Sequence, residues 1–243
     1  MQHTASPFRA VLTWLGRHEL GFLLSIAGIV AGLWIFALLA DEVMEGGTAA
    51  IDRKILLAMR NPANPADPIG PPVVEEAARD ITALGGVTIL TFLTLVIGGY
   101  LILDGKQRLA LFIWGSVFTG LLASSALKYV FGRPRPDIVP QLTYATHSSF
   151  PSGHAMLSAV TYLTLGALLA RSDSRKRMKA YFMLVATFMT LAVGVTRVYL
   201  GVHWPSDVLA GWTAGAIWAL LCWRVAAWLQ QRQAIESENG EQA

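Results

Sequence analysis

The sequence predicts an all-α integral membrane protein, a bundle of six transmembrane helices with a helical segment outside the cytoplasm between the first two spans. Two observations lead to this fold class. Of the 243 residues, 54% are hydrophobic and only 14% are charged, whereas soluble domains carry about 25% charged residues. The apolar residues also gather in six runs, and one span needs about 20 residues. We therefore expect one domain, residues 1–229, followed by a polar tail, residues 230–243.

Short polar or proline-containing stretches separate the six runs. The first run is longer than the roughly 7–15 apolar residues of a signal peptide, so we expect it to remain as the first span. The last three runs have only 16 or 17 residues, and each adjoins a polar motif. Their helices should extend into those motifs and place them near a membrane surface. In order, the runs are Leu20–Ala40, Ile81–Leu103, Leu109–Leu127, Ala155–Ala170, Ala180–Thr196 and Val208–Trp223.

Positive charges between the runs predict the orientation. Cytoplasmic loops are enriched in basic residues, and the loop Arg171–Lys179 has five in nine residues, while Lys106 and Arg108 lie in another short loop. With six spans, these loops share one side with both termini. We therefore expect cytoplasmic termini in a bacterial-type plasma (inner) membrane, with the other loops facing the periplasm or exterior.

The first outer segment, residues 41–80, differs from the other loops. It contains NPANPADPIGPP at Asn61–Pro72, a proline-rich break that no helix crosses intact. Two short helices are expected beside it, near Ala49–Met59 and Val73–Ile81. The segment is either a surface connector or a pair of interfacial helices that admit a lipid head group, and both interpretations remain open.

Three polar stretches on the predicted outer side hold the residues expected to do chemistry. They are KYVFGRPRP at Lys128–Pro136, PSGH at Pro151–His154 and TRVYLGVHWPSD at Thr196–Asp207. Ionisable residues at membrane-embedded helix ends are costly and are functional candidates. Their basic side chains suit a phosphate anion, because arginine offers a bidentate fork and lysine a point charge. These side chains are Lys128, Arg133, Arg135 and Arg197, of which Arg133 could equally be an interface anchor.

The second and third stretches each stand at the start of an apolar run. Ser152 can cap that helix, and Gly153 lets backbone N–H groups approach an anion. His154 lies at the same rim, where an imidazole can donate a proton. In the third stretch a proline suited to the first helical position places Asp207 in the first turn, four residues after His203. The carboxylate can orient one ring nitrogen, so that the other can attack phosphorus.

The order and spacing of these motifs resemble the tripartite signature of the type 2 phosphatidic acid phosphatase superfamily. That group includes phosphatidylglycerophosphatase B-like and undecaprenyl-diphosphatase enzymes and shares its site with vanadium haloperoxidases and glucose-6-phosphatase. The resemblance covers the chain from about Leu20 to Trp223, with threonine at 196 where the family often has serine. The matching positions are Lys128, Arg135 and Pro136, then Pro151–His154, then Thr196, Arg197, His203 and Asp207.

The resemblance implies metal-independent hydrolysis of a phosphate or diphosphate ester on a membrane lipid, through a phosphohistidine and without a cofactor. It implies that His203 is the nucleophile, His154 the general acid and Asp207 the orienting group. The implied phosphate-binding residues are Lys128, Arg135, Ser152, Gly153 and Arg197.

Other functions stay open on the sequence. A lipid phosphotransferase would use the same intermediate but pass the phosphoryl group to an acceptor hydroxyl, and a membrane anion carrier would use the basic cluster without chemistry. The absence of a long basic block argues against nucleic acid, and the lone Cys222 is expected to be an inert thiol. The sequence leaves the lipid unassigned among phosphatidylglycerophosphate, phosphatidic acid, undecaprenyl diphosphate and lipid A phosphates, and leaves the oligomeric state unassigned.

Overall fold

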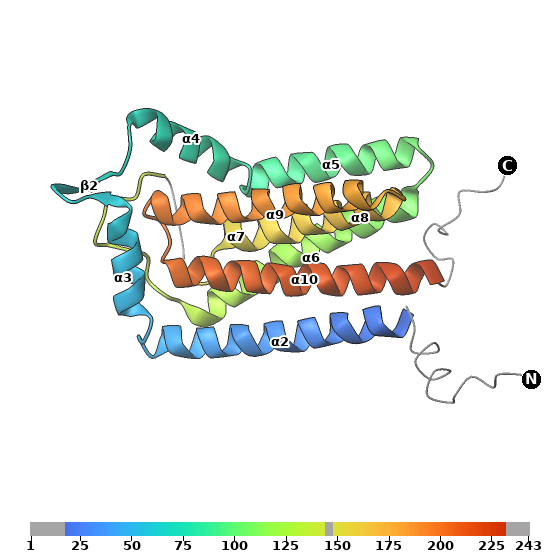
Figure 1. The fold of residues 1–243 in the computed structure, drawn as a ribbon, viewed down its shortest axis with the longest axis horizontal. Helices are drawn as coiled ribbons and strands as arrows, with labels where there is room; N and C mark the ends of the chain where they lie inside the picture. The colour runs from blue at the N-terminus through green and yellow to red at the C-terminus, as the bar shows by residue number, and fades with distance from the viewer. Residues whose placement is uncertain (1–17, 144–147, 232–243) are drawn as a thin grey trace, which may run out of the picture.

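The protein is a bundle of long helices that lie side by side (Figure 1). The computed structural model describes residues 18–143 and 148–231. In this part of the chain four long helices are continuous: α2 (His18–Met44), α6 (Gln107–Phe131), α9 (Lys176–Tyr199) and α10 (Pro205–Gln231). A further span joins α7 (Gly153–Ser158), the π-helical turn η1 (Ala159–Leu163) and α8 (Thr164–Ser172). This span is the most enclosed of the candidate spans, since 67% of its apolar window is buried.

The second predicted span is broken. The run Ile81–Leu103 does not form one helix but is divided between α4 (Pro72–Ala83) and α5 (Val87–Leu103), which meet at a bend of 50°. The helix packing is close at the break. A Cβ at Gly85 would lie 2.3 Å from Cγ1 of Val193 on α9, so α9 can approach this point only because the residue there has no side chain.

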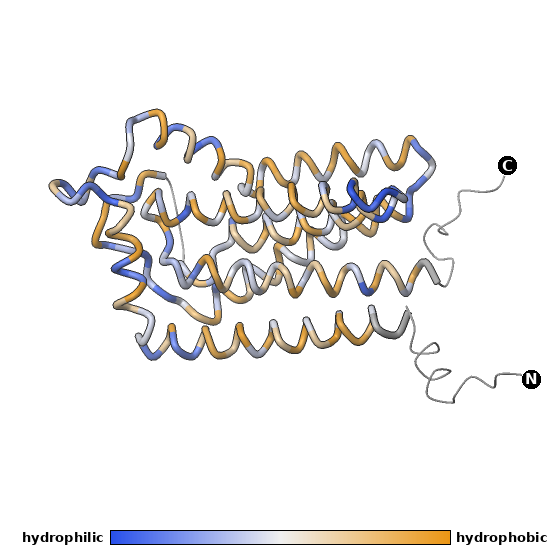
Figure 2. Tube along the Cα trace, viewed as in Figure 1, coloured by the Kyte–Doolittle hydropathy of each residue, from blue (hydrophilic) through white to orange (hydrophobic). Residues whose placement is uncertain are grey.

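The long helices carry mostly apolar residues along their length (Figure 2). Five helices of the described chain are long and apolar enough to cross a membrane, and the bent pair α4–α5 can make a sixth span. Trp34, Phe92 and Phe188 expose 68%, 67% and 69% of their surface. Soluble proteins seldom leave so much large apolar surface in water, whereas lipid accommodates it. The predicted six-span membrane bundle is confirmed.

The helices extend into the polar motifs, as the short apolar runs predict. The central span begins at Gly153, α9 continues to Tyr199, and α10 begins at Pro205. Helix α6 ends at Phe131 because the next residue, Gly132, has a left-handed φ of 59°, a conformation that strains residues with a side chain. These boundaries all lie at the same end of the bundle (Figure 1).

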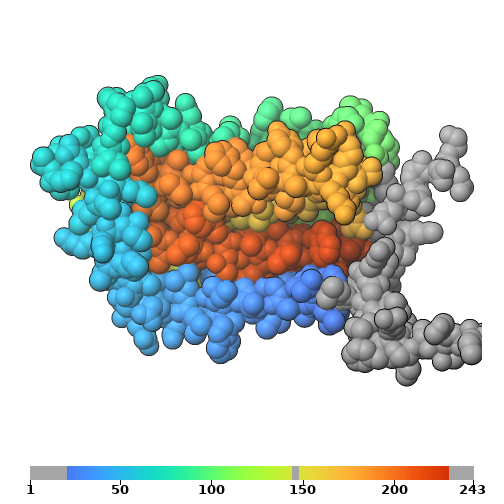
Figure 3. Space-filling model, viewed as in Figure 1, coloured from blue at the N-terminus to red at the C-terminus, as the bar shows by residue number. Residues whose placement is uncertain are grey.

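The outer segment covers that end of the bundle (Figure 3). It begins with α3 (Ala49–Ala58), continues through a two-stranded hairpin of β1 (Arg60–Asn61) and β2 (Asn64–Pro68), and ends in α4. The two short helices predicted there are confirmed with slightly different bounds. The hairpin was not predicted, because its strands are very short and proline-rich and show no alternation of apolar and polar residues. In it, Arg60 lies opposite Pro68.

Candidate active site

The three polar motifs meet beneath the outer segment. The backbone N–H of Ser152 donates to the carbonyl of Asp207 at 2.9 Å, which joins the second motif to the third. Lys128 of the first motif and His154 of the second are both electrostatic neighbours of Arg135 and Arg197. The structure therefore gathers all eight predicted site residues: Lys128, Arg135, Ser152, Gly153, His154, Arg197, His203 and Asp207.

The two residues of the predicted nucleophile pair face one another and are buried. Nδ1 of His203 lies 3.4 Å from Oδ2 of Asp207, and the two residues expose 1% and 0% of their surface. This separation is longer than a strong hydrogen bond, but catalytic contacts of this kind often tighten only when substrate binds. The same oxygen accepts from the backbone N–H of Trp204 at 2.9 Å. With Nδ1 turned to the carboxylate, Nε2 is the nitrogen available to a substrate.

Two basic side chains line the region around the nucleophile. Arg135 Nη1 donates to the carbonyl of Val202 at 2.7 Å and lies 3.2 Å from Nε2 of His203. Lys128 Nζ donates to the carbonyl of Ser148 at 3.1 Å. A Cβ at Gly153 would lie only 3.2 Å from Cε of Lys128, so a larger residue at position 153 would crowd the lysine.

The start of α7 is built as the sequence predicts. Ser152 is the N-cap of α7, and its hydroxyl oxygen accepts from the backbone N–H of Ala155 at 3.5 Å. His154 follows in the first turn and is partly buried. A Cβ at Gly86 would lie 3.7 Å from Nε2 of His154, so this histidine lies beside the break between α4 and α5.

Arg197 is enclosed and only partly paired. It exposes 3% of its surface, and its Nη1 donates to Oγ1 of Thr82 on α4 at 3.0 Å. Its Nε has no acceptor among the described residues. Because a buried cationic donor without a partner is costly, a bound anion would satisfy it. The sequence did not predict a role for Thr82, because a threonine near a helix end gives no indication that it contacts an arginine 115 residues away.

Arg133 has neither of the roles weighed from the sequence. Its guanidinium joins two buried carboxylates: Nη1 donates to Oδ1 of Asp207 at 2.5 Å and Nη2 to Oδ2 of Asp52 at 2.9 Å. Asp52, on α3, was also missed. The only hint in the sequence is its position one turn before Leu56, which is fully buried, and the adjacent Arg53 and Lys54 obscure that pattern.

Burial governs the charge of His203. Its pKa is lowered from 6.5 to about 4, chiefly by desolvation and also by Arg197 and Arg135, whereas Asp207 opposes the shift. The imidazole is therefore neutral near pH 7, the form with a lone pair for attack.

Cationic side chains supply the positive charge of the site. Within residues 18–143 and 148–231, no group of three or more His, Cys, Asp or Glu side chains is arranged to hold a metal ion. Arg135 lies 3.2 Å from Nε2 of His203, Arg197 is a charged neighbour of the same ring, and Lys128 is a charged neighbour of both arginines. A buried histidine–aspartate pair beside such a cluster, at one end of a transmembrane bundle, defines an integral membrane enzyme that acts on phosphate.

Comparisons with known proteins agree with this class. Residues 108–231, which contain all three motifs, match the family described as the PAP2 superfamily. The chain is 33% identical to phosphatidylglycerophosphatase B of Bacillus subtilis (strain 168) over 150 residues, 60% of this chain and 72% of that protein. It is 31% identical to an undecaprenyl-diphosphatase of Sulfolobus acidocaldarius over 121 residues, which span about half of each protein (48% and 54%).

A solved structure gives the same result for the fold. The crystal structure of a transmembrane PAP2 type phosphatidylglycerolphosphate phosphatase from Bacillus subtilis matches with a TM-score of 0.73 and 27% identity, over 84% of this chain and 98% of that one. The chain belongs to the PAP2 superfamily, as its motifs predict, and it is a phosphatase.

Proposed function

We propose that the chain hydrolyses a phosphate or diphosphate ester on a membrane lipid through a covalent phosphohistidine, without a metal ion. The geometry of His203 carries this proposal: Nδ1 faces Asp207 at 3.4 Å while Nε2 lies 3.2 Å from Arg135. A neutral imidazole held in this way has one nitrogen free to attack, next to a cation that can bind the phosphoryl oxygens.

In the first step, Nε2 of His203 forms a bond to phosphorus while the bond from phosphorus to the leaving oxygen breaks. Lys128, Arg135 and Arg197 stabilise the charge on the equatorial oxygens. His154, whose protonated form the bound phosphate anion favours, gives its proton to the leaving oxygen. The lipid leaves as an alcohol or, from a diphosphate, as the monophosphate.

In the second step, water replaces His203 on phosphorus. His154, now neutral, takes a proton from the water as its oxygen attacks, and the N–P bond breaks to release inorganic phosphate. Asp207 faces the proton on Nδ1 during both steps, so it stabilises the positive charge of the phosphorylated ring. Both histidines end in their starting protonation states.

The membrane setting and the relatives support a lipid as the substrate. The site lies at one end of the spans (Figure 1), where lipid head groups would be. The relatives are named as phosphatases of phosphatidylglycerophosphate and undecaprenyl diphosphate. The match over 98% of the Bacillus subtilis structure favours phosphatidylglycerophosphate as the preferred substrate of this chain.

Phosphate release by detergent-purified protein in EDTA tests the chemistry. His203→Ala should abolish release, and His154→Ala should slow it by about 10²–10⁴-fold, the usual contribution of a general acid. His18→Ala is the matched control, because His18 begins α2 at the other end of the bundle. Near-normal turnover by His203→Ala would falsify the nucleophile assignment. Rapid quenching with radiolabelled lipid phosphate should also give acid-labile label on the wild type and none on His203→Ala.

A panel of lipids tests the substrate. The values of kcat/KM for phosphatidylglycerophosphate, phosphatidic acid, undecaprenyl diphosphate and a lipid A phosphate should be highest for the first. A higher value for another lipid reassigns the substrate without affecting the chemistry.

We further propose that the termini are cytoplasmic and that the site faces the periplasm or exterior of a bacterial-type inner membrane. The support is the basic loop between α8 and α9, which lies at the end opposite the site (Figure 1). Ala63 in the turn of the hairpin and Ser174 in that loop are exposed, and Cys222 is buried. A membrane-impermeant maleimide should label Ala63→Cys in intact cells but Ser174→Cys only after permeabilisation. The reverse pattern would invert the topology.

A further inference from the structure

Helix α3 of the outer segment carries one carboxylate that is fully enclosed. Asp52 exposes 1% of its surface, whereas the next two residues, Arg53 and Lys54, are exposed. A carboxylate is buried only at high cost unless it is paired and hydrogen-bonded. The partners of Asp52 therefore indicate what its burial serves.

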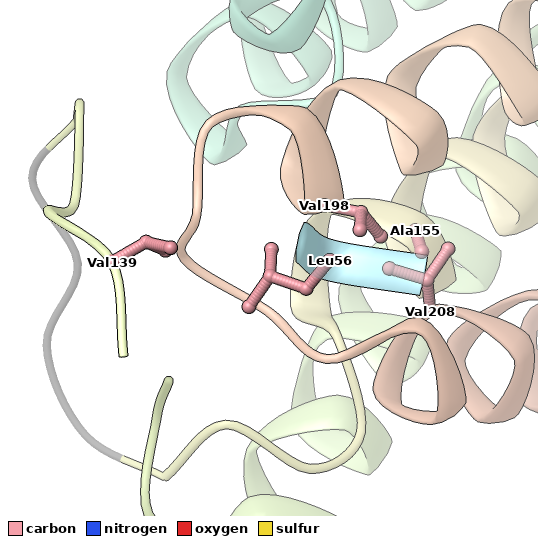
Figure 4. Close-up of a cluster of buried hydrophobic side chains, with 5 residues drawn as sticks. All are labelled: Leu56, Val139, Ala155, Val198 and Val208. Carbon is pink, nitrogen blue, oxygen red and sulfur yellow. The ribbon is translucent and has the colours of Figure 1, made fainter. Parts of the chain in front are cut away.

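The face of α3 that carries Asp52 is packed against the helices of the site. Leu56, one turn after Asp52, belongs to a buried cluster with Ala155 of α7, Val198 of α9 and Val208 of α10 (Figure 4). Each of these three partners directly follows a motif residue of the site in the sequence. The docking of α3 thus fixes Asp52 relative to all three helices at once.

Asp52 holds the first turn of α10. Its Oδ1 accepts from the backbone N–H of Ser206 at 2.9 Å, and its Oδ2 accepts from the Ser206 hydroxyl at 2.6 Å. Its Oδ2 also accepts from Nη2 of Arg133 at 2.9 Å. Ser206 directly precedes the catalytic Asp207, so Asp52 contacts both the backbone beside that carboxylate and its arginine partner.

Arg133 transmits this restraint to the nucleophile pair. Its Nη1 donates to Oδ1 of Asp207 at 2.5 Å and to the Ser206 hydroxyl at 2.8 Å. Because Arg133 occupies Oδ1, the other oxygen of Asp207 is the one that faces Nδ1 of His203. Because Asp52 holds Nη2, and the arginine side chain is only 12% exposed, Arg133 is not free to turn towards a substrate.

We propose that Asp52 is a positioning residue for catalysis, which through Arg133 fixes the carboxylate of Asp207 and keeps its negative charge available to His203. The proposal rests on the proposed function, because it assumes that His203 takes positive charge during the reaction. Asp52, Arg133 and Asp207 together carry a net charge of −1. Without Asp52, Arg133 would neutralise Asp207, and the phosphorylated imidazole would lose the counter-charge that stabilises it.

The substitution Asp52→Asn tests this proposal, because it removes the charge and keeps the shape. We expect kcat to fall by about 10- to 150-fold, the value of a lost charged hydrogen bond, with KM changed less than about twofold because the phosphate-binding side chains are untouched. Asp80→Asn is the matched control, since Asp80 is exposed in the same outer segment. Wild-type kcat in Asp52→Asn would overturn the proposal.

A second readout separates positioning from a structural role and does not depend on turnover. In protein labelled with ¹⁵N-histidine, the His203 ring, identified by its loss in His203→Ala, should carry its proton on Nδ1 in the wild type and in Asp80→Asn. In Asp52→Asn it should show a mixture of tautomers. Lower kcat with an unchanged tautomer would mean that Asp52 only anchors α3, and would overturn the proposal. If the tautomer depends on Asp52 but the wild-type protein releases no phosphate, the proposed function alone is refuted.

If Asp52→Asn does not fold, the paired change Asp52→Asn/Arg133→Gln replaces it, because this variant leaves no unpaired buried charge from the two residues. It should fold, and Asp207 keeps its negative charge but loses the arginine that holds Oδ1. We therefore expect kcat to fall by up to about tenfold at unchanged KM, with a mixture of tautomers. Wild-type kcat with an unchanged tautomer in the paired variant would overturn the proposal.

Discussion

Replacing Thr82 with valine would remove one hydroxyl from the site while leaving the volume of the side chain almost unchanged. Oγ1 of Thr82 accepts from Nη1 of Arg197 at 3.0 Å. Arg197 exposes 3% of its surface, and its Nε has no acceptor in the described part of the chain. Water cannot readily take the place of the lost hydroxyl, so the guanidinium would have to shift or remain less satisfied.

The size of the effect follows from these contacts. A hydrogen bond to a charged group contributes about 1.5–3 kcal/mol, and about 1.4 kcal/mol corresponds to a tenfold change. Because Arg197 is a proposed phosphate ligand, the loss should appear in catalysis. We expect Thr82→Val to lower kcat/KM by about 10- to 150-fold, and Thr82→Ser, which keeps the hydroxyl, to retain most of the activity.

Phosphate release from a detergent-solubilised lipid phosphate is the assay, and Thr94→Val is the matched control. Thr94 is also buried, at 4% exposure, but its hydroxyl donates to the carbonyl of Leu90 in its own helix at 2.5 Å. The control should stay within about twofold of the wild type. Equal losses in both variants, or a Thr82→Val enzyme within twofold of wild type, would refute a specific role of Thr82 in placing Arg197.

Three further predictions concern packing, pH and metal. A Cβ at Gly194 would lie 2.3 Å from the ring of Trp212, whereas none of the atoms around Gly115 lies within 4 Å of a Cβ there. In thermal unfolding, Gly194→Ala should therefore lose about 1–3 kcal/mol, and Gly115→Ala should gain up to about 1 kcal/mol. The pKa of His203, lowered from 6.5 to about 4, means that its contribution to stability is present above pH 6.5 and is lost as the pH falls towards 4; an NMR titration of this ring with a midpoint near 6.5 would contradict this. Prolonged dialysis against a chelator should leave kcat unchanged. If the rate is lost and then recovers when a divalent cation is added, the site does not rely on Lys128 and Arg135 alone.

The spans and the motif positions could be predicted because their signals are local. A membrane requires long apolar runs, which can be read from composition alone. Ser152 marks a helix start through its capping hydroxyl and Pro205 through its fixed φ, so the positions of His154 and Asp207 in first turns followed from adjacent residues. The structure places both as expected.

The features that were missed depend on partners far away in the chain. Asp52 is 81 residues from Arg133 and 154 from Ser206, and Thr82 is 115 residues from Arg197. Nothing near these residues distinguishes them from ordinary polar residues at a helix face or end. The close approach of α9 at Gly85 depends in the same way on a distant residue, Val193, because the role of a glycine in an apolar run is clear only once the helix packed against it is known.

These contacts change how the outer segment should be interpreted. A surface connector would have no reason to bury Asp52 against Arg133 or Thr82 against Arg197, and helices that only admit lipid would present apolar faces rather than hydrogen-bonding groups to the site. Instead, α3 supports the side of the site that holds the proposed nucleophile, and α4 supports a side chain of the basic cluster. Because the hairpin joins α3 to α4, a displacement of this unit would disturb the proposed nucleophile and the proposed phosphate ligands together. Changes at Asp52 or Thr82 should therefore alter the catalytic rate as well as any preference among lipids.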